Sequence, residues 1–221
     1  MTLTMTSRDA ILQRVRAEVS KTPGVAQPPV PEVWPRNNLT PAAMAEQFTA
    51  ELIAVQGEVI RCATMQDARR RLAELVEQAK WTSIGAMDRP AVREVTGDLP
   101  ADMVHWQLDD WTSHQMATLS VSVIAPEALL ADTGSCVIAC PTAVDRLLCY
   151  LPPACVVIAR ASQLAEHLPA AWAAVAPQVA DPARRGEFVI VTGPSRTADI
   201  EKILILGVHG PKRLVVLLVE N

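Results

Sequence analysis

The sequence lacks the long apolar segments that direct a chain into or through a membrane. Its N-terminus, MTLTMTSRDAILQRVRAEV, contains no apolar core of signal-peptide length, and no run of about 18 uncharged apolar residues occurs in the 221 residues. We therefore expect a cytoplasmic protein with no membrane span. A basic excess is also lacking: the net charge of -4 argues against a nucleic-acid partner, because nucleic-acid-binding proteins carry basic patches.

The motifs of common cofactor and metal sites are missing as well. None of the five cysteines forms a C-x-x-C pair, and neither a Walker loop nor the dinucleotide fingerprint G-x-G-x-x-G is present. An odd number of cysteines suits a reducing compartment. We expect no metal and no cofactor in this chain, and small buried thiols at Cys62, Cys136, Cys140, Cys149 and Cys155.

What the sequence does contain is enough apolar material for a large core. Half of its residues are apolar, and a chain of this length buries roughly 70% of the surface that it exposes when unfolded. A short amphipathic helix over residues 7–19 is followed by a segment, from Pro23 to Pro41, that holds six of the 17 prolines. We therefore predict an N-terminal helix and Pro-rich arm over residues 1–40 and an α/β domain over residues 41–221.

Alternating helix and strand patterns predict an α/β fold with a mostly parallel sheet and flanking helices. Expected helices cover residues 41–56, 64–80, 162–175 and 197–207, and expected strands cover residues 57–62, 81–86, 103–106, 119–124, 155–159, 188–192 and 214–219. Strict alternation in 119–124 predicts one buried face, whereas the continuous apolar run 214–219 predicts a central strand covered on both faces. Two further strands, 128–131 and 136–139, flank a β-hairpin turn.

The turn of this hairpin is the first candidate site, with the sequence Asp132-Thr133-Gly134-Ser135. It is similar to the active-site loop of aspartic proteases, but those enzymes need two such aspartates and this chain has one copy. Two interpretations stay open. The segment is either a plain turn or a hairpin tip that lines a ligand pocket, where an acid, two hydroxyls and a glycine permit close approach and hydrogen bonding.

A second candidate follows the strand 188–192, where Gly193-Pro194 forces a turn before the expected helix. Ser195 and Thr197 are good helix caps, and the first turn of a helix exposes backbone N–H groups and a partial positive charge. With the guanidinium of Arg196, they would hold a carboxylate or phosphate. Asp199 and Glu201 lie in the same segment. They either complement the helix dipole, or they orient the arginine or act on a substrate proton.

His209 lies between two glycines just before the last apolar strand. A loop histidine at that position is either a proton-transfer group or a turn residue that bonds to backbone.

Several of these segments together resemble a known family. The stretch GPSRTADIEKILILGVHGPKRLVVLLVE resembles the C-terminal signature of the lactate utilization (LUD) domain family, and LLADTGSCVI, RLLCYLPP and the opening helix SRDAILQRVRAEV fit the same pattern. The resemblance implies a NagB/RpiA/CoA-transferase-like fold. It also implies a role in oxidising L-lactate to pyruvate together with two partner proteins that carry iron–sulfur clusters. The positions that match the family pattern are Asp132, Thr133, Gly134, Ser135, Arg146, Gly193, Ser195, Arg196, Thr197, Asp199, Glu201 and His209.

Three hypotheses about function follow. The first is a subunit of an iron–sulfur-linked complex that oxidises L-lactate, in which the Asp132 hairpin and the Ser195-Arg196 loop meet at the carboxyl edge of the sheet and bind a small carboxylate. Asp132 or His209 is then the catalytic proton-transfer group. The second is a non-catalytic scaffold whose N-terminal arm docks the iron–sulfur partners. The third, by fold analogy alone, is a transferase or isomerase acting on a CoA ester or a sugar phosphate.

Overall fold

The protein is described by a computed structural model that covers residues 6–21, 33–34, 37–106, 108–180, 187–198, 204–207 and 210–220. The chain divides into two compact units, Met1–Pro35 and Arg36–Asn221. The first unit contains helix α1 (Ser7–Val19), which begins with a capping box formed by Thr6 and Asp9. All strands that the structure describes lie in the second unit. Among the described residues, no helix is long and apolar enough to cross a membrane.

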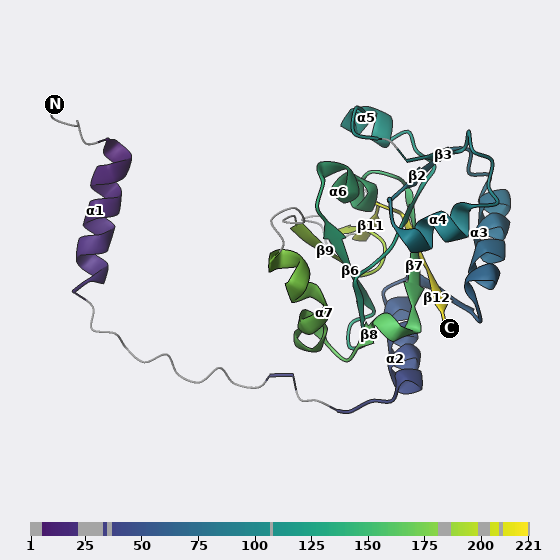
Figure 1. The fold of residues 1–221 in the computed structure, drawn as a ribbon, viewed down its shortest axis with the longest axis horizontal. Coiled ribbons are helices and arrows are strands. Elements are labelled where there is room, and N and C mark those ends of the chain that lie inside the picture. Colours follow the sequence, from purple (N-terminus) through teal and green to yellow (C-terminus); the bar gives the residue numbers. More distant parts are fainter. Residues whose placement is uncertain are drawn as a thin grey trace. The chain divides into compact units, whose positions relative to one another are not determined.

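A parallel sheet of six strands forms the centre of the second unit, as the helix and strand alternation predicted (Figure 1). Its order is β1-β12-β7-β4-β2-β3, and every neighbouring pair is parallel. The predicted central strand is confirmed, because β12 (Arg213–Val219) pairs with a strand on each side and buries residues 214–219 completely. The other strands are β1 (Glu58–Cys62), β2 (Ile84–Ala86), β3 (Val104–His105), β4 (Val121–Ile124) and β7 (Ala154–Arg160).

Helices cover both faces of this sheet (Figure 1). Successive residues of β7 alternate between two cores, with Val157 on one side and Val156 and Ile158 on the other. The second core is closed by α3 (Met65–Ala79) and α4 (Pro90–Thr96). The first is closed by α2 (Pro41–Ala54), α6 (Ala143–Tyr150) and a second sheet, with the short α5 (Ser113–Met116) beside α6.

The second sheet has four strands in the order β8-β5-β6-β9. The predicted hairpin is confirmed, because β5 (Ala128–Leu130) and β6 (Ser135–Cys140) pair antiparallel. The remaining strands are β8 (Leu164–Ala165) and β9 (Glu187–Val191). Helix α7 (Leu168–Ala180) packs on the outer face of this sheet through Ala171 and Val175, opposite the face that joins the main core.

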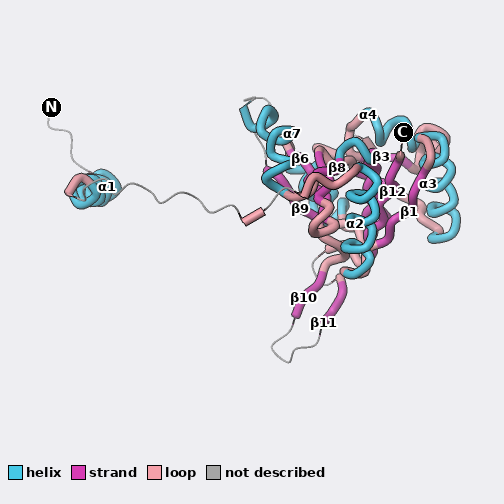
Figure 2. The backbone as a smooth tube through the Cα atoms, turned by 90° about the horizontal axis from the view of Figure 1, so that it is seen from below, coloured by secondary structure: helices cyan, strands magenta, loops and turns pink. Residues whose placement is uncertain are grey.

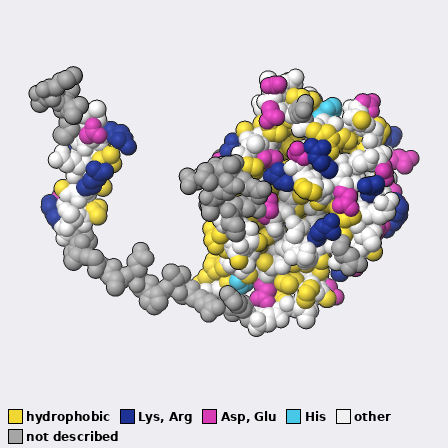
Figure 3. Space-filling model, in the orientation of Figure 1, with side chains coloured by type: hydrophobic (Ala, Val, Ile, Leu, Met, Phe, Trp, Pro, Cys, Tyr) yellow, Lys and Arg dark blue, Asp and Glu magenta, His cyan; other side chains and the backbone are white. Residues whose placement is uncertain are grey.

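Charged side chains on helices α3 and α4 form ion pairs with opposite charges and do not form patches of one sign. On the face that Figure 3 shows, acidic and basic groups are interspersed over α3 and α4. Arg70 contacts both Asp67 and Glu74, and Arg69 reaches Asp98. Exposed pairs of this kind contribute at most about 1 kcal/mol each. This surface therefore offers no basic patch for a polyanion.

Two predicted elements differ from the structure in extent or burial. Strand β4 is buried on both faces, because it lies inside the sheet between β2 and β7, and its Ser122 donates a hydrogen bond to the Ala154 carbonyl. The helix expected over 162–175 begins only at Leu168. The residues before it form a 3-10 turn (Ala161–Gln163) and strand β8, whose Leu164 pairs with Leu129.

The helix expected over residues 197–207 is wrong. An antiparallel ribbon stands there, formed by β10 (Arg196–Ala198) and β11 (Leu204–Leu206), and Figure 2 shows that it projects from the body. The run Ile203-Leu204-Ile205-Leu206 is rich in β-branched residues, which favour extended backbone over helix. The helix N-terminus that was expected to bind an anion is therefore absent.

Candidate functional site

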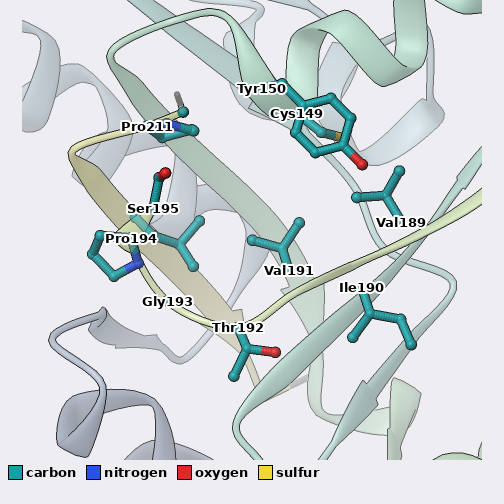
Figure 4. A pocket seen from close by; sticks show the side chains of 12 residues that line it. Cys149, Tyr150, Val189, Ile190, Val191, Thr192, Gly193, Pro194, Ser195 and Pro211 are labelled. Atoms are coloured by element: carbon teal, nitrogen blue, oxygen red, sulfur yellow. The ribbon is translucent and has the colours of Figure 1, made fainter. Parts of the chain in front are cut away.

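The Ser195 turn borders a pocket of about 320 Å³, which we call the amino-edge pocket (Figure 4). It lies where β12 begins, at the amino-terminal edge of the large sheet. Tyr150 and Val189 lie at one end and Pro194 and Ser195 at the other, with Val191 between them. Its polar side chains are hydroxyls and a thiol, on Thr192, Ser195, Tyr150 and Cys149.

The backbone of this turn is fixed by contacts within the protein. Gly193 has a φ of 79°, and a side chain there would collide with Val55, the residue that follows α2. The Ser195 N–H donates to the Pro211 carbonyl at 2.8 Å, and the Ser195 carbonyl accepts from the Gly207 N–H at 2.8 Å. The backbone N–H of Ser195 is therefore already hydrogen-bonded within the protein and does not bind an anion.

Arg196 lies in β10, and its guanidinium donates to the Val55 carbonyl. It is not among the residues that line the amino-edge pocket. Thr197 is placed by its backbone opposite Ile205 in the ribbon. Asp199, Glu201 and His209 lie outside the described residues, so their assigned roles stay predictions.

The Asp132 hairpin and the Ser195 turn do come close together. Strand β6 pairs with β9, and the Ser135 hydroxyl lies 2.7 Å from the hydroxyl of Thr192, which precedes the turn. Ser135 also donates to Thr133 at 2.8 Å, and Thr133 donates to the half-buried Asp132 carboxylate at 3.3 Å. Gly134 packs on Leu52, near the end of α2.

The Ser195 turn lies at the opposite edge of the large sheet from the one that the sequence hypothesis predicted. The turn bonds to Pro211, and Lys212 bonds to Pro153, so this region lies at the amino ends of β7 and β12 and not at the carboxyl edge. The amino-edge pocket includes Thr192 but not Asp132. The two segments therefore meet through a line of hydroxyl groups beside the pocket.

Arg146 lies on α6 and forms an ion pair with Glu187, at 2.6 Å between Nη1 and Oε1. It stands one turn before Tyr150, whose pKa is raised, chiefly by burial. Arg146 does not line the amino-edge pocket. Its ion pair with the exposed Glu187 carboxylate instead links α6 to β9.

A second hollow region lies at the carboxyl edge of the large sheet, and we call it the carboxyl-edge crevice. It consists of two adjoining hollows of about 370 and 530 Å³ that share Asp88 and Trp106. The residues after β2, the residue after β3 and the start of α6 all contribute to it. Strand β3 follows β2 along the chain and lies beside it at the edge of the sheet. Strand β4 lies on the opposite side of β2, and the order continues from β4 to β7, away from β3. Ligands of open α/β sheets bind at such a reversal of strand order.

Charge and aromatic surface are combined in this crevice. The Arg93 Nε donates to Asp88 at 2.6 Å, and the Arg93 guanidinium stacks 4.5 Å from the centre of the Trp106 ring. The bond from Arg93 lowers the pKa of Asp88, so this carboxylate is ionised at neutral pH. His105 lines the larger hollow, and the centre of its ring lies 5.1 Å from the centre of the Trp111 ring.

Arg89 is the half-buried cation of the smaller hollow. One Nη donates to the Ala139 carbonyl at 3.2 Å and the other to the Asp88 carbonyl at 3.0 Å. A guanidinium carries five N–H donors, so this anchored fork keeps donors for a carboxylate. Sequence reasoning missed it, although a charged Asp88-Arg89 pair placed soon after an apolar strand was a usable signal.

The start of α6 forms another wall of the smaller hollow. Thr142 caps the helix, and the Asp145 carboxylate accepts hydrogen bonds from the Thr142 hydroxyl at 2.8 Å and from its backbone N–H at 3.3 Å. Asp145 is therefore engaged in capping. Among the described residues, no three His, Cys, Asp or Glu side chains are placed to share a metal ion.

Comparison with known proteins identifies the family. The sequence model of the LUD domain family matches residues 45–219 of this chain. The chain belongs to the LUD domain family. A DUF162 family protein from Deinococcus radiodurans has the same fold, with a TM-score of 0.59 at 18% identity, over 82% of this chain and 99% of that one. The α/β expectation is thus confirmed.

Curated relatives match a shorter part of this LUD domain protein. "Uncharacterized protein YkgG" of Escherichia coli is 35% identical over 112 residues, which are 48% of this chain and 47% of the relative. "Lactate utilization protein C" of Bacillus pumilus is 32% identical over 101 residues (45% and 42%), and that of Bacillus licheniformis is 31% identical over 107 residues (46% and 43%). Each match spans less than half of the relative's length.

Proposed function

We propose that this LUD domain protein serves lactate utilization as the subunit of an L-lactate-oxidising system that binds the small carboxylate. The iron–sulfur clusters of this system reside in partner proteins. The family match and the relatives named lactate utilization protein C support the metabolic role. The observation that carries the binding role is Arg89, a half-buried guanidinium in a hollow at the reversal of strand order.

The proposed site is the carboxyl-edge crevice rather than the Ser195 turn. An arginine fork matches a carboxylate in geometry and charge, and a hollow of about 370 Å³ accommodates a three-carbon acid. Arg196 is a weaker candidate, because its guanidinium is committed to the Val55 carbonyl. Asp132 lies beside the amino-edge pocket and does not line the crevice.

Oxidation of lactate to pyruvate removes two electrons and two protons. In this proposal the partner clusters would accept the electrons. Histidine is the side chain that most often serves as a general base, and His105 lines the hollow next to that of Arg89. Asp88 is less suited to the task, because its bond to Arg93 keeps it ionised and engaged.

Isothermal titration with L-lactate and with pyruvate tests the binding role. The Arg89→Gln variant loses a charge-assisted pair of about 1.5–3 kcal/mol, so its Kd should rise roughly 10- to 100-fold. Arg196→Gln is the matched control and should bind as the wild type does. Binding that survives in Arg89→Gln and disappears in Arg196→Gln would move the site to the Ser195 turn. A wild-type chain that binds neither acid would refute the binding role.

A further inference from the structure

Four of the five cysteines lie in one core, between the large sheet and the second sheet. They are Cys136, Cys140, Cys149 and Cys155, and each is at most 2% exposed. Within this group, one pair is in direct contact: the sulfur atoms of Cys140 and Cys149 are 4.0 Å apart. Cys140 is the last residue of β6, and Cys149 lies in the last turn of α6.

Both members of this pair are held by ordered elements. The Cys149 thiol also lies 3.3 Å from the Asp145 carbonyl, one helical turn earlier, and Cys140 lies 3.8 Å from the Ile138 carbonyl. A disulfide has a sulfur–sulfur distance of about 2.05 Å, so the two sulfurs must approach by about 2 Å to form one. That approach requires a shift of α6 toward the end of β6.

The contact between the two sulfurs moves their pKa values in opposite directions. The hydrogen bond with Cys149 lowers the pKa of Cys140, whereas burial and the Asp145 carboxylate raise it. The guanidinium groups of Arg89 and Arg146 lower it to a smaller extent. The pKa of Cys149 is correspondingly raised. For a thiol outside the pair, burial has the opposite effect: it raises the pKa of Cys155 to about 12. A thiolate is the reactive form of cysteine, and the hydrogen bond within the pair favours it at one sulfur, whereas burial disfavours it at Cys136 and Cys155.

A small molecule can reach one sulfur of the pair. Cys149 lines the amino-edge pocket, whose volume of about 320 Å³ admits a peroxide. On the other side, Pro141 and Thr142 directly follow Cys140 and line the carboxyl-edge crevice. The two sulfurs therefore lie between the two hollows, against α6, which contributes residues to both.

We propose that Cys140 and Cys149 form a redox-active dithiol that a peroxide converts into a reversible disulfide. The thiolate of one cysteine of the pair attacks one peroxide oxygen, the O–O bond breaks, and hydroxide leaves, which gives a sulfenic acid. The sulfur of the other cysteine then attacks the sulfenic sulfur, the S–O bond breaks, and water leaves. The two thiols lose two protons and two electrons, and one hydrogen peroxide becomes two waters. This proposal is independent of the lactate role.

Mass spectrometry of the folded full chain after treatment with hydrogen peroxide tests the proposal. The intact mass should fall by two hydrogen atoms, and dithiothreitol should restore it. Trypsin cleaves after Arg146, so the disulfide should join the peptide 94–146 to the peptide 147–160. A folded chain that retains all five free thiols, or that gains oxygen without forming this link, would overturn the proposal.

Variants identify which cysteines form the link. Cys155→Ala is the matched control, because Cys155 lies in the same core and the same tryptic peptide, and it should still lose two hydrogens. Cys149→Ala should instead leave Cys140 as a sulfenic acid that dimedone traps. Phenylarsine oxide, which bridges close thiols, should bind the wild type at one equivalent and Cys149→Ala not at all. Disulfide formation in Cys149→Ala, or its loss in Cys155→Ala, would contradict the assignment.

Discussion

Gly134 fixes the position of the hairpin at the scale of a single residue. Its φ is 62°, and a Cβ there would lie 2.4 Å from the backbone nitrogen of Leu52. The residue therefore satisfies two demands at once: a left-handed turn and contact with the backbone of α2. The turn itself was predictable from the sequence Asp-Thr-Gly-Ser. Its contact with α2 was not, because that contact depends on where a helix some 80 residues earlier packs.

Gly134→Ala should lower the free energy of unfolding by more than about 2 kcal/mol, since it combines an unfavourable φ with a clash against backbone that cannot move aside. Urea denaturation measures this loss. Gly97→Ala is the control: Gly97 has a φ of -61°, and its nearest contact is the Arg69 guanidinium at 3.5 Å, so the change should stay within about 0.5 kcal/mol. Equal effects of the two substitutions would contradict the close-approach argument.

At the scale of elements, α6 is the structure that both hollows share. It begins in the carboxyl-edge crevice with Thr142 and ends at the amino-edge pocket with Tyr150. With only eight residues, it is too short to be stable by helix propensity and depends on its cap and its packing. Leu148 provides the packing, since it is fully buried against the large sheet.

Removal of the cap should therefore weaken α6. Thr142→Ala loses the hydroxyl that accepts from the Asp145 N–H and donates to its carboxylate, at a cost of about 1–2 kcal/mol in urea denaturation. Thr142→Ser keeps the hydroxyl and should stay within about 0.5 kcal/mol of the wild type. If the serine variant is destabilised as much as the alanine variant, the methyl group rather than the cap is what stabilises the helix start.

Elements with a single strong pattern were predictable, and the ribbon was not. The apolar run of β12 and the amphipathic α3 each contain one consistent signal along the chain. In residues 195–207, the cap residues and Gly207 favour a helix, whereas Ile203 and Ile205 favour strands. The pairing of Thr197 with Ile205 decides the outcome, and pairing across a turn is not encoded in local periodicity.

At the scale of the whole molecule, strand order determines which loops can share a site. β1 and β2 are consecutive along the chain, yet three strands, β12, β7 and β4, separate them in the sheet. Sequence patterns predict that a strand is parallel and buried, but they do not predict this order. The residues that meet at the carboxyl edge, such as Arg89 and Trp106, were therefore overlooked. The Ser195 turn was expected there because it follows a strand, but that strand, β9, belongs to the second sheet.

The buried apolar residues of the described chain all lie between Ala45 and Val219, and α1 buries none of its residues. A chain that begins at Arg36 should therefore unfold at the same temperature as the full chain. A chain that begins at Pro41 should not, because it also loses the N–H groups of Asn37 and Leu39, which donate to Glu166 at 2.8 and 2.6 Å. Bonds to a charged acceptor contribute about 1.5–3 kcal/mol each, so this shorter chain should unfold several degrees lower.

Circular dichroism during heating compares the three chains, and co-purification with iron–sulfur partners gives the second measurement. Under the docking hypothesis, the chain that begins at Arg36 should keep its unfolding temperature and its carboxylate binding but lose the partners. Retention of the partners would place the docking surface on the α/β body instead. A lower unfolding temperature for this chain would show that residues 1–35 stabilise the body, because loss of a separate docking arm removes no part of the core.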